Sequence, residues 1–159
     1  MKYVEGAQLV IAGDGDIKRD LERMVQREGL GEKVFFRGRL PLEELWKLTA
    51  GADLGVSVEE DVGLNYRYAL PNKLFDYIQA RVPVLVTRLP EMAAIVDHYQ
   101  IGLTVDSPEP RLLAEAIKIG LFDPKRRRKW IANLEKAAAD LTWEKEERVL
   151  REIFESFRK

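Results

Sequence analysis

Two short apolar runs decide the fold of this chain: Asp53-Leu54-Gly55-Val56-Ser57-Val58 and Val82-Pro83-Val84-Leu85-Val86-Thr87. Neither run shows the polar alternation of a half-exposed strand, so both predict strands covered on two faces. A helical segment opens between them at Pro71-Asn72-Lys73, which makes a crossover unit of a parallel sheet. Ligands of open parallel sheets bind beyond the carboxyl ends of the strands. We therefore expect a site at the loop from Val58 to Leu70 and at the amino end of the following helix.

The same alternation of strand and helix extends in both directions from this unit. Further strands are predicted at Leu9 to Ala12, Lys33 to Phe36 and Gly102 to Val105, with helices between and after them. Five strands predict one α/β domain over residues 1–159, with a doubly wound parallel sheet between two helical layers. The last helix has an apolar face from Val149 to Phe157, which we expect to pack back on the domain.

Composition and charge exclude several classes of function. The chain has 26 basic and 27 acidic residues, so no nucleic-acid partner is expected. It has no cysteine and one histidine, His98, which excludes thiolate and histidine-rich metal sites. The apolar runs are far shorter than the roughly 20 residues of a membrane span, and the first residues lack the layout of a signal peptide. These observations predict a soluble, cytoplasmic protein.

A glycine-rich turn, Gly13-Asp14-Gly15, follows the first predicted strand. Its backbone amides can face a phosphate or a carbonyl group at the start of the next helix. The full dinucleotide fingerprint is missing, because Lys18 stands where the third glycine would be. A turn that needs glycine only for its geometry explains the stretch equally well.

Asn72 and Lys73 form the strongest candidate anion site, because they begin the helix after Pro71. Free N–H groups, the positive end of the helix dipole and an ammonium group all attract an anion there. Asp76 lies one turn further on nearly the same face, where it can accept hydrogen bonds from vicinal hydroxyls such as those of a ribose. The alternative for Asp76 is an acid stabilised only by the helix dipole.

An acidic run, Glu59-Glu60-Asp61, follows the first of the two central strands. Carboxylates at this position can orient the hydroxyls of a sugar. A solvated loop explains the run equally well. No residue is assigned as catalytic beyond the candidates Glu59 and Glu60.

Taken together, these motifs resemble the C-terminal, donor-binding domain of the group 1 glycosyltransferases, which have two facing Rossmann-like domains (the GT-B fold). The resemblance is carried by stretches in the family's order: Leu9 to Gly15, Val34 to Gly38, Ala52 to Ser57, Leu70 to Tyr77 before Val82-Pro83-Val84, and Gly102 to Val105.

The resemblance implies transfer of a sugar from a nucleotide-sugar to an acceptor, with retention and without a metal or other cofactor. Asp76 would bind the ribose of the donor, at a position where glutamate is usual. Asn72 and Lys73 match the Pro-Asn-Lys variant of the motif. The turn of Gly13, Asp14 and Gly15 matches a loop that lines the nucleotide, and so do Arg37 and Gly38.

The chain departs from the family pattern at two positions. Tyr68 stands where a first glutamate is common, so the residue that meets the donor sugar is not identified, and Glu59 and Glu60 lie further upstream. Arg81 replaces the glycine that usually precedes the Val82-Pro83 strand, which questions the turn between helix and strand.

The family's domain begins with one more strand and helix, and an N-terminal domain supplies its acceptor site. Residues 1–159 contain neither. Removing that strand from the family order 3-2-1-4-5-6 and closing the gap predicts a five-stranded sheet of order 2-1-3-4-5. The alternative is that a partner chain donates the strand, which would force the formation of a homodimer.

We therefore expect the donor-nucleotide-binding half of a glycosyltransferase, inactive without the missing N-terminal acceptor domain. A nucleotide-diphosphate sugar is its expected partner, and peripheral membrane association of the full enzyme stays open. The first rival is a non-catalytic interaction module that retains the fold. A second rival is half of a nucleotide-sugar epimerase or of a phosphorylase.

Overall fold

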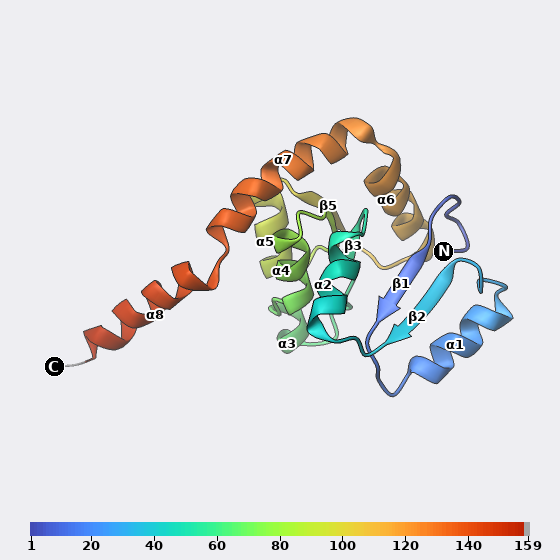
Figure 1. Ribbon diagram of the computed structural model, residues 1–159, viewed down its shortest axis with the longest axis horizontal. Coiled ribbons are helices and arrows are strands. Elements are labelled where there is room, and N and C mark those ends of the chain that lie inside the picture. Colours follow the sequence, from blue (N-terminus) through green and yellow to red (C-terminus); the bar gives the residue numbers. More distant parts are fainter. Residues whose placement is uncertain (158–159) are drawn as a thin grey trace.

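A computed structural model describes residues 1–157 of the chain (Figure 1). Strands and helices alternate, as the sequence predicts. The elements are β1 (Leu9–Ala12), α1 (Lys18–Arg27), β2 (Val34–Gly38), α2 (Leu42–Ala50), β3 (Gly55–Ser57), α3 (Leu64–Arg67), α4 (Asn72–Gln79), β4 (Val84–Thr87), α5 (Pro90–Tyr99), β5 (Gly102–Val105), α6 (Pro110–Phe122), α7 (Pro124–Asp140) and α8 (Trp143–Ser156). The short helix α3 lies within the segment predicted as a loop.

The strands form two parallel sheets in the described residues. One sheet pairs β1 with β2, and the other has the order β3-β4-β5. The predicted α/β class with parallel pairing is confirmed, but the single sheet of order 2-1-3-4-5 is not, because no pairing joins β1 to β3 in residues 1–157. The break lies where the family that the sequence resembles has its further strand. Strands pair only at a spacing of about 4.7–4.9 Å, so a gap left by a strand does not close unless the helices around it also move.

The apolar core surrounds the β3-β4-β5 sheet. All four residues of β4 are buried. Its neighbours in the core include Leu74 and Ile78 of α4, Met92 of α5 and Leu134 of α7. The prediction that the central crossover is covered on both faces is therefore confirmed for β4.

The β1-β2 sheet is covered much less well. Val10 of β1 and Phe35 of β2 keep 40% and 37% of their surface exposed, and no residue of the range Lys18–Arg27 is buried. The backbone hydrogen bonds between β1 and β2 therefore contribute more to this sheet than apolar packing against it does.

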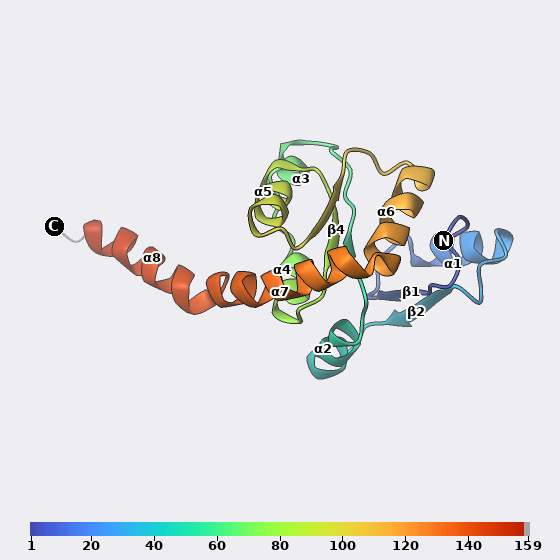
Figure 2. The same cartoon turned by 90° about the horizontal axis from the view of Figure 1, so that it is seen from above.

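Helix α8 extends away from the rest of the molecule (Figures 1 and 2). The prediction that it packs back on the domain is wrong, because none of the residues Trp143–Ser156 is buried. Its apolar face remains open, with Phe154 at 65% exposure. An apolar stripe indicates that a helix has a partner but does not say where that partner is. In the described part of the chain, every helix is too short or too polar to cross a membrane.

Arg81 forms the turn between α4 and β4 with φ at +61°, in the left-handed region that favours glycine. Its guanidinium also pairs with Glu135 at 3.1 Å. We expect Arg81→Gly to be more stable than Arg81→Ala by about 1 kcal/mol, because both variants lose the ion pair and only glycine relieves the backbone. Urea unfolding of the two variants measures the difference. Equal stabilities would show that the turn is not strained.

Candidate functional site

Two of the three glycines predicted to line a nucleotide, Gly13 and Gly38, are joined at the ends of β1 and β2. The backbone N–H of Gly13 donates to the carbonyl of Gly38 at 2.7 Å. Gly13 has φ at +132° and Gly38 at +64°, so both need glycine for the turn itself. The geometric explanation of these glycines therefore holds whether or not a ligand binds. Arg37, just before Gly38, is exposed.

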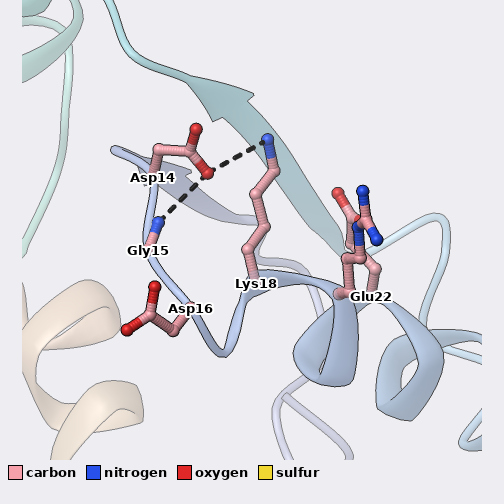
Figure 3. Close-up of a pocket in the computed structure, with 6 residues that line it drawn as sticks. Asp14, Gly15, Asp16, Lys18 and Glu22 are labelled. Carbon is pink, nitrogen blue, oxygen red and sulfur yellow. Dashed lines mark hydrogen bonds and ion pairs between the residues drawn. The ribbon is translucent and has the colours of Figure 1, made fainter.

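A solvent-open hollow lies beside this turn (Figure 3). It is lined by Asp14, Gly15, Asp16, Lys18, Arg19 and Glu22. Within it, Nζ of Lys18 lies 3.9 Å from the Asp14 carboxylate, which also accepts a hydrogen bond from the N–H of Gly15. Lys18, which the sequence marks only as a missing glycine, thus brings an ammonium group to the ends of the strands.

The first turn of α4 presents its polar side chains outward. Asn72, Lys73 and Asp76 are exposed, while Leu74 and Ile78 on the opposite face are buried. Nζ of Lys73 forms an ion pair with Oε1 of Glu59 at 3.1 Å. The helix therefore offers its free N–H groups and a lysine at one place, as the sequence predicts.

Two hydroxyl residues that sequence analysis did not identify support Glu59. The N–H of Glu59 donates to Oγ1 of Thr87 at 2.6 Å, and Oγ of Ser57 donates to the Glu59 carboxylate at 3.4 Å. Ser57 and Thr87 are the last residues of β3 and β4, and both are buried. The sequence signal that could have identified Ser57 and Thr87 is a small hydroxyl residue at the end of an apolar strand.

The rest of the acidic run has a different environment. The guanidinium of Arg67 forms three hydrogen bonds with the Asp61 carboxylate, at 2.7 to 3.1 Å, and holds the pKa of Asp61 below its usual value. This pair ties the loop to α3. Glu60 is exposed. Only Glu59 of the run contacts a residue of α4 through an ion pair within the described chain.

The predicted site residues that contact one another thus form two groups. One group comprises Gly13, Asp14, Gly15 and Gly38, to which the structure adds Lys18, and the other comprises Lys73 and Glu59. No hydrogen bond or ion pair in residues 1–157 connects the two groups, and Lys73 does not line the hollow beside Gly15. The same described residues contain no cluster of three or more His, Cys, Asp and Glu side chains able to hold a metal ion.

Comparison with solved structures shows the fold. HepE from Anabaena, crystallised in complex with UDP, superposes with a TM-score of 0.79 and 17% identity, covering 98% of this chain and 43% of that chain. Sucrose-phosphate synthase from Thermosynechococcus elongatus superposes with a TM-score of 0.74 and 24% identity, covering 98% of this chain and 41% of that chain.

Comparison of sequences shows the family. An uncharacterized glycosyltransferase of Methanocaldococcus jannaschii is 31% identical over 119 residues, which cover 74% of this chain and 28% of that protein. The chain therefore spans less than half the length of each of these relatives. The sequence model of the family described as "Glycosyl transferases group 1" matches residues 2–137. The chain belongs to the group 1 glycosyltransferases.

Proposed function

We propose that this chain is the donor-nucleotide-binding part of a retaining glycosyltransferase that transfers a sugar from a nucleotide-sugar. The observation that carries the proposal is the exposed first turn of α4, where Asn72 and Lys73 follow the end of β3 within the family match. Helix N-termini at the carboxyl ends of parallel strands favour the phosphates of a nucleotide. The HepE structure with bound UDP supports the same class of ligand.

Each residue predicted to bind the donor nucleotide has a role in this proposal. Asn72, Lys73 and the N–H groups of α4 contact the diphosphate, and Asp76 accepts hydrogen bonds from the ribose hydroxyls one turn away. The turn of Gly13, Asp14 and Gly15 lines the nucleotide together with Arg37 and Gly38. Lysine and amide donors can stabilise a leaving diphosphate by themselves, so we expect transfer to require no metal.

The acceptor side of the reaction needs further polypeptide. The β1-β2 and β3-β4-β5 sheets do not pair with each other in the described residues, and the apolar face of α8 is open. Both features support a working form in which an acceptor domain, or a second copy of the chain, completes the structure. Positioning two substrates together supplies much of the rate of such a reaction. We therefore expect the isolated chain to bind the donor and to transfer sugar very slowly.

Titration calorimetry with UDP, GDP and ADP tests the proposal and identifies the base. We expect one nucleotide to bind with a measurable heat, and Asp76→Ala to weaken that binding by about 10-fold through the loss of charge-assisted bonds to the ribose. Glu115→Ala, which removes an exposed carboxylate from an ion pair with Lys118 on α6, at 2.8 Å, serves as the matched control. Absence of heat with all three nucleotides would contradict the proposal and favour the interaction module.

A further inference from the structure

Glu59 is the carboxylate that lies against the cation of the proposed diphosphate site. Its Oε1 is 3.1 Å from Nζ of Lys73. The Glu59 side chain keeps 19% of its surface exposed, whereas Lys73 keeps 46%. The carboxylate is therefore the more enclosed member of the pair, and the ammonium is the member that a ligand can reach.

Buried strand ends hold Glu59 in this place. Its backbone N–H donates to the Thr87 hydroxyl at the end of β4 at 2.6 Å, and its carboxylate lies 3.4 Å from the Ser57 hydroxyl at the end of β3. Ser57 is 0% exposed and Thr87 is 5% exposed. Groups supported by regular elements are held more accurately than groups on free loops. The negative charge of Glu59 therefore stays close to Lys73 when an anion approaches.

A fixed carboxylate beside this lysine acts differently on ligands of different charge. The terminal phosphate of a free nucleoside diphosphate is joined to the chain by one anhydride bond and, like a phosphate monoester, has a charge of about −1.5 to −2 near neutral pH. When a sugar is attached, the same phosphate also carries an ester bond and keeps a single negative charge. Repulsion between like charges grows with the magnitude of each charge. Glu59 therefore opposes binding of the free diphosphate more strongly than binding of the sugar nucleotide.

We propose that Glu59 is a specificity-determining residue, which favours the nucleotide-sugar over the nucleoside diphosphate and so promotes release of the nucleotide product. This inference rests on the proposed function, which puts the diphosphate at Lys73. It assigns to Glu59 an electrostatic role that does not require contact with the transferred sugar.

The test compares the affinities of UDP and UDP-glucose, or of the GDP or ADP pair if that base is the one bound, in calorimetry of the wild type and of Glu59→Gln. We expect Glu59→Gln to tighten binding of the free diphosphate by about five- to tenfold and of the sugar nucleotide by about twofold. The uncharged nucleoside should bind both proteins equally. Glu59→Asp keeps the charge and should keep the wild-type preference.

The matched control is Glu43→Gln, which removes a carboxylate from an exposed ion pair with Lys47 on α2, at 2.7 Å, and should change neither affinity. If Glu59→Gln does not fold, Glu59→Ala replaces it in the same comparison, because it also removes the carboxylate and should tighten binding of the free diphosphate more than binding of the sugar nucleotide.

Two results would overturn the inference. A wild type that binds no nucleotide contradicts the proposed function itself. A wild type that binds, with Glu59→Gln changing the affinities for both ligands by one common factor, contradicts only the role of Glu59.

Discussion

Lys73→Ala is expected to weaken the binding of a nucleoside diphosphate by about 10- to 100-fold. A hydrogen bond between a charged donor and a phosphate contributes about 1.5–3 kcal/mol, and each 1.4 kcal/mol is a factor of ten in Kd. In the wild type, Oε1 of Glu59 lies 3.1 Å from Nζ of Lys73, so the substitution also leaves the Glu59 carboxylate without its counter-charge. Loss of the attraction and gain of the repulsion act in the same direction, so the effect exceeds that of a single exposed ion pair.

Lys47→Ala is the matched control for this prediction. Lys47 forms an ion pair with Glu43 at 2.7 Å, and both side chains are largely exposed. Calorimetry should give the control the affinity of the wild type. Both variants should unfold at nearly the same urea concentration as the wild type, because exposed ion pairs contribute at most about 1 kcal/mol to stability. A Kd for Lys73→Ala within twofold of the wild type would exclude the start of α4 as the diphosphate site.

The sequence predicts the parts of the fold that depend on neighbours along the chain. The unbroken run from Val84 to Thr87 is buried throughout, as an apolar stretch without alternation indicates. Pro71 precedes the first residue of α4, where its fixed φ suits a helix start. Such signals need only a few adjacent residues.

The parts that depend on distant segments are not predictable in the same way. The contact of Glu59 with Thr87 joins residues 28 positions apart, and no periodicity indicates which hydroxyl will meet which amide. The resemblance to the family predicted a single sheet in which β1 and β3 are neighbours, but no strand pairing joins them in residues 1–157. The pattern of either apolar run does not report whether two strands pair.

The candidate site also has parts that depend on neighbouring residues and parts that depend on distant ones. Residue types at strand and helix ends predict where Lys73, Asn72 and the Gly13 turn lie, because such ends have free N–H groups. The roles of Lys18 and Glu59 follow from side chains that reach across turns, to Asp14 in one case and to Lys73 in the other. Charge on a loop or in a first helical turn is too common to identify such a pair in advance.

Gly102→Ala should lower the free energy of unfolding by about 2–4 kcal/mol. Gly102 lies in β5 opposite Val84 of the central strand. A Cβ at this position would stand 1.9 Å from the carbonyl oxygen of Val84 and 2.8 Å from its carbonyl carbon and its nitrogen. These are backbone atoms of a fully buried strand, so they cannot turn aside as the end of a flexible side chain can. The ladder between β4 and β5 must therefore open locally to accept the methyl group.

Gly31→Ala is the control, because a Cβ there meets no described atom within 4 Å, and its stability should stay within about 0.5 kcal/mol of the wild type. Urea unfolding followed by circular dichroism measures both variants, and an unchanged slope shows that only stability has changed. Equal midpoints for the two variants would mean that β5 does not approach β4 as closely as the structure shows. Because β4 also ends in Thr87, which holds Glu59, a well-folded Gly102→Ala protein with altered nucleotide preference would connect the packing of this sheet to the site.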